Sequence, residues 1–349
     1  MSRPAVSFIA WGRVTERSSE IAAALGGEAR CFYSLGIARR PLVPVRYLLS
    51  AAQTVGYLLR RRPRALIVTN PPIFPGLIAW IYVRLTGAAA VLDSHPGSFG
   101  LKGDWVSAQF LPLHRYLVRR MSATLVTDER LANVVFGWGG WPEIVHEAPP
   151  GWRVAPPRRA EGALRLLLVT VFDPDEPVAE VVKAVKAVAK QGGIELRITG
   201  DPARCVQAIR AAAASAPIEF TGYLRGDQYR RALEAADVVL ALTTEPNSIV
   251  RAGCEAVYAR RPLIVSDWRA SREAFPYAVH VANDALSIGA GIQRARAEHE
   301  RLRAAADDAY DVQEERWLRQ LAALRHRLRL DAHERPEALV VARSGGARA

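Results

Sequence analysis

Residues 218–267 read IEFTGYLRGDQYRRALEAADVVLALTTEPNSIVRAGCEAVYARRPLIVSD, and this stretch decides the fold. Three apolar runs, at Ile218–Thr221, Val238–Thr243 and Pro262–Ser266, alternate with two segments of helical periodicity, Gln228–Ala236 and Arg251–Ala259. Short apolar strands that alternate with helices indicate a parallel sheet covered by helices on both faces. The stretch therefore predicts part of a doubly wound α/β domain.

The same alternation extends toward the N-terminus. Strands are expected at Leu164–Thr170 and Ile194–Thr199, with helices at Val178–Ala189 and Ala203–Ala214. A separate α/β series lies in the first half of the chain. Its expected strands are Val6–Trp11, Ala65–Thr69, Ala89–Asp93 and Thr124–Thr127, and its expected helices are Val45–Arg60, Phe74–Leu85 and Leu111–Met121.

Proline marks the boundary between the two series, because it removes a backbone donor and blocks helix. Pro149, Pro150, Pro156 and Pro157 crowd this part of the chain. We expect a first domain at 1–150, a linker at 151–163, a second domain at 164–290, helices at 291–330 that could pack back on the first domain, and a flexible tail at 331–349. Residues 285–330 are expected to be helical with an interruption at Ala309–Val312.

The charge and the cysteines limit the class of protein. The formal net charge is +12, but no nucleic-acid recognition motif is present, so we expect no nucleic-acid partner. Three dispersed cysteines without a C-x-x-C pair favour a reducing cytoplasm, and the N-terminus lacks the zones of a signal peptide.

One apolar and basic segment leaves a membrane contact open. Residues 42–59 are apolar over much of their surface and end at Arg60, Arg61 and Arg62, a pattern that suits an anionic lipid surface. A core helix with a solvated basic end would have the same sequence pattern. The apolar stretch 73–90 is too interrupted for a confident membrane span.

Polar residues follow the strands of the second domain. In an open parallel sheet the ligand lies beyond the carboxyl ends of the strands. Two glycine turns and a polar helix start should therefore meet there, and a helix N-terminus suits a phosphate. The candidates are Gly200, Asp201, Gly222, Tyr223, Asn247, Ser248, Arg251 and Glu255. Asn247 and Ser248 are also ordinary helix-capping residues.

These pieces, in this order, resemble the C-terminal half of the family-4-like (group 1) GT-B glycosyltransferases. The resemblance is carried by Phe220-Thr221-Gly222, Ala236-Asp237-Val238, Glu255-Ala256 and Arg261 to Asp267. It implies a GT-B fold, in which two Rossmann-like doubly wound domains with parallel sheets face a central cleft. It also implies a nucleotide-sugar donor on the second domain.

Carried over by position, Glu255 matches the second glutamate of the family's E-x7-E element, which binds the donor's ribose hydroxyls. Asn247 stands where the first glutamate would be. The loop that usually holds a basic pair is acidic here, with Asp173, Asp175 and Glu176, so Arg251 is the local substitute for binding the leaving group. We interpret the acidic loop as a capping turn and expect neither a metal nor a cofactor.

In the first domain the resemblance implies a residue facing the transferred sugar after the strand at 89–93. His95 occupies that place and could contact the sugar or relay the acceptor's proton, with Asp93 orienting it. Trp11, Gly12 and Arg17 follow the first strand, where the family approaches acceptor or phosphate.

The resemblance implies a hexosyltransferase, of retaining type, that acts on a glycan or lipid-linked acceptor in cell-surface polysaccharide or glycoconjugate synthesis. We expect it in the cytoplasm, with a peripheral site at the inner membrane face open. The alternative is a non-catalytic GT-B binding or scaffolding protein. A nicotinamide oxidoreductase is disfavoured because no G-x-G-x-x-G follows a strand into a helix.

Overall fold

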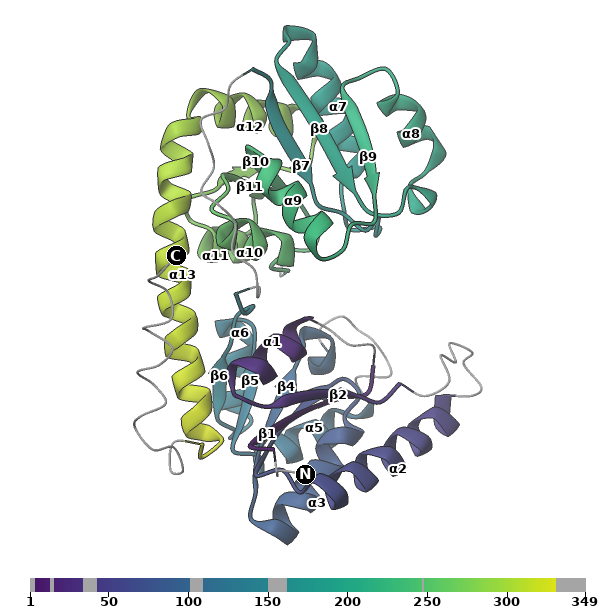
Figure 1. Ribbon diagram of the computed structural model, residues 1–349, viewed down its shortest axis with the longest axis vertical. Coiled ribbons are helices and arrows are strands. Elements are labelled where there is room, and N and C mark those ends of the chain that lie inside the picture. Colours follow the sequence, from purple (N-terminus) through teal and green to yellow (C-terminus); the bar gives the residue numbers. More distant parts are fainter. Residues whose placement is uncertain are drawn as a thin grey trace, which may run out of the picture. The chain divides into compact units, whose positions relative to one another are not determined.

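The computed structural model describes residues 4–12, 16–33, 43–100, 109–149, 162–246 and 248–330. The chain divides into two compact units. Unit 1 comprises residues 1–148 and 316–349, and unit 2 comprises residues 149–315. Each unit contains a six-stranded sheet in which all the strand pairs are parallel (Figure 1).

Unit 1 follows a strand–helix alternation along the chain. Its sheet order is β2-β1-β3-β4-β5-β6. The elements are β1 (Val6–Ala10), α1 (Glu16–Ala24), β2 (Glu28–Cys31), α2 (Val43–Arg61), β3 (Ala65–Asn70), α3 (Phe74–Thr86), β4 (Ala89–Ser94), η3 (Pro96–Phe99), α5 (Leu111–Val118), β5 (Ala123–Val126), α6 (Glu129–Gly137) and β6 (Pro142–Ile144).

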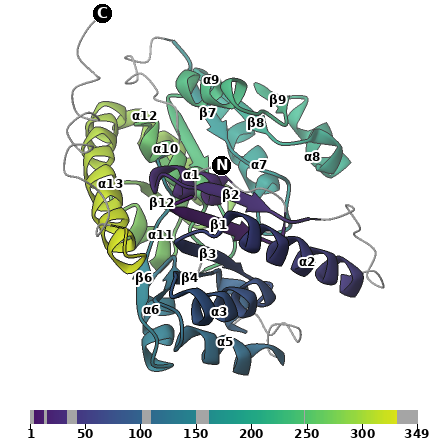
Figure 2. The same cartoon turned by 60° about the horizontal axis from the view of Figure 1, so that its bottom comes forward.

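The inner strands of unit 1, β1, β3, β4 and β5, are buried on both faces, and successive side chains enter different cores. In β4, Ala89 and Val91 pack with α1, whereas Ala90 and Leu92 pack with α3 and α5. Helices α2, α3, α5 and α6 therefore cover one face of the sheet (Figure 2). The other face is covered by α1 and by the last turns of the C-terminal helix, which contribute Trp317 and Leu324.

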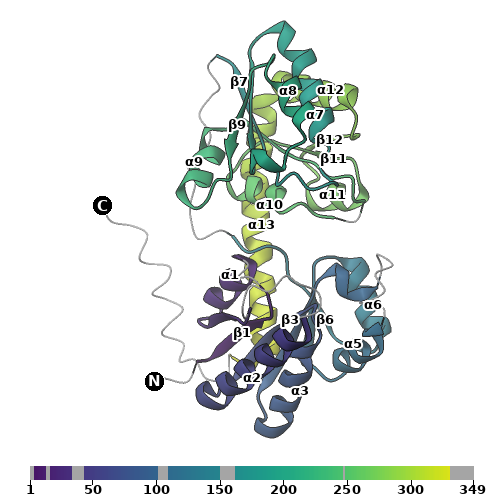
Figure 3. The same cartoon turned by 90° about the vertical axis from the view of Figure 1, so that its right-hand side faces the viewer.

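Unit 2 repeats the plan with the sheet order β12-β11-β10-β7-β8-β9. The elements are β7 (Leu164–Leu168), α7 (Val178–Val188), η4 (Ala189–Gln191), β8 (Ile194–Thr199), η5 (Pro202–Arg204), α8 (Gln207–Ala213), β9 (Ile218–Gly222), α9 (Asp227–Ala235), β10 (Val238–Ala241), α10 (Arg251–Tyr258), β11 (Leu263–Ser266), α11 (Arg269–Ala274), β12 (Val279–Val281) and α12 (Ala285–Ala297). Helices α7, α8 and α12 cover one face, and α9 and α10 cover the other (Figure 3).

The structure corrects two of the expected helices. The helix expected over 203–214 is a short η5 followed by α8, because Cys205 and Val206 have extended backbone angles. The interruption expected at Ala309–Val312 is also wrong. Helix α13 (His299–Arg327) runs through it, and the break falls at Glu298, between α12 and α13.

The continuity of α13 has a visible cause in unit 2. Its Tyr310 ring lies 6.3 Å from the Tyr258 ring, and the Arg260 guanidinium lies 4.2 Å above Tyr310. These contacts outweigh the low helix propensity of the Asp- and Tyr-containing segment. Over the described ranges, no helix has both the length and the apolar character needed to cross a bilayer.

Candidate functional site

The strand order of unit 2 has its switch point at the middle of the sheet. Strands β7 and β10 are neighbours, and the chain leaves them toward opposite edges of the sheet, which is where α/β proteins bind ligands. The loops after these two strands contact each other here. Asp175 Oδ2 accepts a hydrogen bond from Thr243 Oγ1 at 2.9 Å, and its carbonyl accepts one from the Thr244 amide at 2.7 Å.

Two glycine turns lie at the carboxyl ends of β8 and β9. Gly200 follows β8 with φ +94°, and Gly222 ends β9 with φ +80°. Their backbones are joined, because the Gly200 amide donates to the Gly222 carbonyl at 3.1 Å. A Cβ atom at Gly200 would lie 2.5 Å from the Thr170 carbonyl oxygen, so this position requires glycine for space as well as for its φ.

Glu255 lies on α10 among partners of its own unit. Arg251 Nε donates to its Oε1 at 2.9 Å, and the Tyr229 hydroxyl of α9 donates to its Oε2 at 2.5 Å. The Glu255 side chain is 13% exposed, so the carboxylate is pre-positioned and still reachable. The sequence pointed to Glu255 and Arg251. It held no signal for Tyr229, whose partner is 26 residues away.

Helix α10 begins at Arg251, and Val250 is its N-cap residue without a side-chain cap. Ser248 therefore lies outside the cap, so the capping role considered for it is wrong. Its amide donates to Glu245 at 3.2 Å. Asn247 lies outside the described residues. The N-terminus of an α-helix directs backbone N–H groups outward, which suits an anion.

The acidic loop is a turn organised by its own carboxylates. Glu176 accepts hydrogen bonds from Thr170 Oγ1 at 2.5 Å and from the Asp173 amide at 2.9 Å, and Asp173 pairs with Arg204 at 2.6 Å. Asp175 is engaged with the β10 loop. Within the part of the chain that the structure describes, no three His, Cys, Asp or Glu side chains gather as a metal site.

The other two donor-side candidates differ in their surroundings. Asp201 caps η5 by accepting from the Ala203 amide at 2.9 Å, which is a structural task. Tyr223 is 58% exposed, and the Arg225 guanidinium lies 5.0 Å from its ring.

A polar network joins the residues that follow β10, β11 and β12, and the sequence analysis did not predict it. Ser266 Oγ accepts from the Thr243 amide at 2.9 Å and donates to Asn283 Oδ1 at 2.7 Å. Asn283 Nδ2 and Trp268 Nε1 both donate to the Thr243 carbonyl, at 2.9 and 2.8 Å. Ser266 ends an expected strand and Trp268 follows it closely, but only the fold shows that both converge on Thr243.

In unit 1, Asp93 lies at the end of β4 and is buried. Its Oδ1 is 3.5 Å from Arg17 Nη2, and its Oδ2 is 3.5 Å from His95 Nε2. Oδ2 is shielded from solvent and has no hydrogen-bond partner among the residues that the structure describes, so the half-exposed His95 is the group placed to meet it. The predicted pair is thus brought together.

The side chains of Arg17 and Trp11 are buried and hydrogen-bonded within unit 1. Arg17 is buried and donates to the carbonyls of Val145 and His146 at 2.9 and 3.1 Å, so its geometry does not favour the phosphate contact expected for it. It positions Asp93 instead. Trp11 is also buried, with Nε1 donating to Thr54 at 2.9 Å, whereas a Cβ at Gly12 would have open space around it.

A buried histidine supports the same strand end. His114 Nδ1 lies 3.1 Å from the Ser98 carbonyl, which can only accept, so Nδ1 carries the proton and Nε2 accepts from Ser94 Oγ at 3.0 Å. Burial lowers the pKa of His114 to about 4. The ring is therefore neutral near pH 7 and fixes the backbone that follows Asp93.

Known structures share this fold over nearly the whole chain. HepE from Anabaena, in a structure described as a complex with UDP and glucose, has a TM-score of 0.68 and 11% identity, over 93% of this chain and 99% of that one. Sucrose-phosphate synthase from Thermosynechococcus elongatus gives 0.65 and 13%, over 97% and 99%. The lipopolysaccharide outer core galactosyltransferase WaaB gives 0.58 and 13%, over 92% and 99%. A search of the curated proteins by sequence gives no match.

The two doubly wound units, each with a six-stranded parallel sheet, define a protein of the GT-B fold. Residues 163–295 match the family described as glycosyl transferases group 1. This match lies within unit 2 and covers most of it, and the predicted resemblance to the group 1 glycosyltransferases is confirmed.

Proposed function

We propose that the protein transfers a hexosyl group from a nucleotide-sugar donor to a glycan or lipid-linked acceptor, in cell-surface polysaccharide or glycoconjugate synthesis. The observation that carries this proposal is the carboxyl edge of the unit 2 sheet. Within the region that matches the group 1 family, a backbone hydrogen bond joins the two glycine turns after β8 and β9, and helix α10, which follows β10, holds Glu255 through Arg251 and Tyr229. The description of HepE with UDP and glucose supports a donor of this chemistry.

Each donor group has a chemically matched partner. The Glu255 carboxylate can accept hydrogen bonds from both ribose hydroxyls once Tyr229 or Arg251 yields an oxygen. The diphosphate would lie at the N-terminus of α10, where backbone N–H groups and Arg251 stabilise negative charge. Gly200 and Gly222 let the backbone approach the ligand closely.

The reaction breaks the bond between the anomeric carbon and the diphosphate and forms one to the acceptor oxygen. The nucleoside diphosphate leaves, and the acceptor hydroxyl loses its proton. His95, oriented by Asp93, contacts the sugar or relays that proton. We propose retention of the anomeric configuration. We also propose that no metal is resident, because carboxylates of the acidic loop already accept hydrogen bonds from the chain itself.

Nucleotide binding to Glu255→Ala tests the donor site. Loss of hydrogen bonds to a charged group, about 1.5–3 kcal/mol each, should weaken UDP binding by roughly 10²- to 10⁴-fold when two are lost. Isothermal titration measures this, after a thermal-shift screen of UDP, GDP, ADP and TDP sugars has chosen the donor. Glu273→Ala, an exposed glutamate on α11, is the matched control. Unchanged affinity in a folded Glu255→Ala protein would refute the site.

We also propose that the protein works in the cytoplasm at the inner membrane face. Helix α2 exposes Leu48 and Leu59 and ends at Arg60 and Arg61. Each basic side chain near an anionic leaflet contributes about 1 kcal/mol. Binding to anionic vesicles should therefore fall with added salt and when Arg60, Arg61 and Arg62 are all replaced by Gln. A protein that ignores such vesicles at low salt has a soluble acceptor.

A non-catalytic scaffolding role is the alternative, and one observation favours it. Both oxygens of Glu255 are occupied by groups of the chain itself. An active transferase should slowly hydrolyse its donor and release free sugar. EDTA should not change this rate. A protein that binds nucleotide but neither hydrolyses nor transfers is a scaffold.

A further inference from the structure

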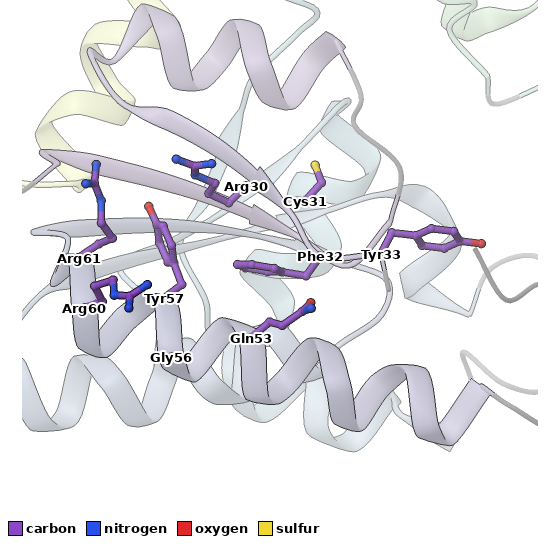
Figure 4. A pocket seen from close by; sticks show the side chains of 9 residues that line it. All are labelled: Arg30, Cys31, Phe32, Tyr33, Gln53, Gly56, Tyr57, Arg60 and Arg61. Atoms are coloured by element: carbon purple, nitrogen blue, oxygen red, sulfur yellow. The ribbon is translucent and has the colours of Figure 1, made fainter. Parts of the chain in front are cut away.

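Unit 1 contains a pocket that the proposed reaction does not use. It lies between strand β2 at the sheet edge and helix α2, and its volume is about 780 Å³, within the range of small-molecule sites. Figure 4 shows its side chains. The lining residues are Arg30, Cys31, Phe32, Tyr33, Gln53, Gly56, Tyr57, Arg60 and Arg61.

The pocket carries an excess of positive charge. Arg30 and Arg61 share Glu28, at 2.7 and 3.2 Å, and Arg60 forms no ion pair with any residue that the structure describes. Three guanidinium groups against one carboxylate leave a net charge of +2. Burial raises the pKa of Glu28, but the Tyr57 hydrogen bond and the nearby arginines outweigh it and lower that pKa. Glu28 therefore stays ionised and holds its two arginines in place.

The floor of the pocket is aromatic and fixed. The Tyr57 hydroxyl donates to Glu28 Oε1 at 2.7 Å and lies 2.7 Å from Ser7 Oγ. The Phe32 ring meets the Tyr57 ring edge-on at 6.0 Å. In Figure 4 both rings lie between the strand and the helix, with Arg30 on the strand and Arg60 on the helix. The cavity thus offers an apolar surface beside cations that suit a phosphate.

A second side of α2 is apolar and faces solvent. Leu48, Val55 and Leu59 are 72%, 43% and 67% exposed, and their spacing of seven and four residues places them on one side of the helix. An α-helix turns by about 100° per residue, so Gln53 and Arg60, which line the pocket, lie on the side of α2 next to this apolar side. The pocket therefore borders an exposed apolar strip.

We propose that this pocket binds the phosphate group of an anionic membrane lipid, whose chain lies along Leu48, Val55 and Leu59. The pocket's charge selects the headgroup, and the strip receives the apolar part. This inference deepens the membrane-facing part of the proposed function by turning a general electrostatic attraction into a defined site. It is separate from the donor site, which lies in unit 2.

The decisive variant fills the pocket without changing charge. A Cβ atom at Gly56 meets no atom within 4 Å, so Gly56→Trp should extend into the cavity and leave the helix intact. The ligand is a short-chain phosphatidic acid kept below its micelle concentration, with inorganic phosphate and a short-chain phosphatidylcholine as comparisons. Titration calorimetry should show saturable binding of phosphatidic acid, at least tenfold weaker in Gly56→Trp.

Charge variants test the arginines. Arg30→Gln and Arg60→Gln should each weaken phosphatidic acid about fivefold, the fold-change that corresponds to about 1 kcal/mol. Arg84→Gln removes the same charge from an exposed site on α3 outside the pocket and should change affinity little. All variants should bind UDP like the parent protein, which separates this site from the proposed donor site.

Three outcomes would overturn the proposal. One is phosphatidic acid binding that Gly56→Trp leaves unchanged, since the ligand would then lie elsewhere. Another is an Arg84→Gln effect equal to that of Arg60→Gln, which would mean diffuse surface attraction. The third is inorganic phosphate binding as tightly as phosphatidic acid, which would make the ligand a soluble phosphate. None of these results would touch UDP binding, so the proposed transferase would stand.

Discussion

Asp93 is a carboxylate removed from solvent at the end of β4. A buried charge is costly unless a partner meets it. Arg17 supplies one partner at 3.5 Å, and the other oxygen lies 3.5 Å from His95. The carboxylate can therefore hold the His95 ring in one orientation.

This pair leads to a kinetic prediction. His95→Gln should lower kcat by about 10²–10⁴, the usual contribution of a proton-transfer group, while the Kd for UDP stays constant. Asp93→Asn should lower kcat as well, because it removes the charge that orients the ring. Steady-state kinetics measures both. His326→Gln, an exposed histidine in the last turn of α13, should behave as the parent protein. Full activity in His95→Gln would exclude the proposed role.

A second prediction at this scale concerns pH. The pKa of His114 is lowered to about 4 by burial, below its ordinary value of 6.5. Between these two values the unfolded chain binds a proton that the folded chain does not. Stability should therefore fall as pH drops through this window, by about 1.4 kcal/mol per pH unit for this one group.

His114→Asn should remove one proton from that dependence and can keep the donor to the Ser98 carbonyl. Urea unfolding at several pH values measures the slope. Burial also lowers the pKa of His146 to about 4, so His146 still contributes its own part of the pH dependence of stability in the variant. An unchanged slope in His114→Asn would show that the ring is protonated in the fold.

At the scale of elements, strands with long apolar runs were predictable and short polar ones were not. The strands β3, β4 and β8 begin at the expected residues, since burial on both faces demands an apolar sequence. The edge strands β2 and β12 were missed. β2 reads EARC and β12 reads VHV, and neighbouring strands rather than their own sequence define them.

The site was predictable only to the level of loops. Parallel topology sends strand ends to one edge, so Gly200, Gly222 and Glu255 could be grouped from sequence. Side-chain partners could not. Arg17 binds carbonyls more than 120 residues away, and Tyr229 reaches Glu255 from another helix. Such pairings depend on tertiary packing that no local pattern records.

The glycine turn after β8 leads to a prediction for an element. Gly200→Ala must accept an unfavourable φ and a clash with the Thr170 carbonyl, whereas Gly222→Ala faces only the φ cost. We expect about 1–2 kcal/mol of destabilisation for Gly222→Ala and more for Gly200→Ala. Chemical unfolding compares the two. Equal costs would mean that the β8 turn shifts freely.

For the whole molecule, α13 matters because it belongs to both units. Its residues up to Glu315 belong to unit 2, and those from Arg316 belong to unit 1. Trp317, Leu324 and Leu328 pack against α1 and the sheet of unit 1. Gln320 also donates to His146 Nδ1 at 2.6 Å, so the end of the chain completes the first unit.

Trp317→Ala should therefore destabilise unit 1 by about 3–5 kcal/mol, the usual cost of removing a buried Trp side chain. Leu318→Ala, at the next position of the same helix and 58% exposed, should cost less than about 0.5 kcal/mol. Urea unfolding followed by tryptophan fluorescence and circular dichroism distinguishes them. Similar costs would contradict the packing of this end of α13 on unit 1.

The division of α13 also makes unit 2 an insertion within unit 1. Unit 2 is one unbroken segment, 149–315, set inside a unit 1 that resumes at Arg316. A graft from a relative would therefore need two junctions, and the second falls within a helix. That junction must keep Trp317, Leu324 and Leu328 in phase, because one added residue rotates the rest of the helix by about 100°. With both junctions kept in register, unit 2 can be exchanged for that of a relative while unit 1 and its β4 edge stay the same.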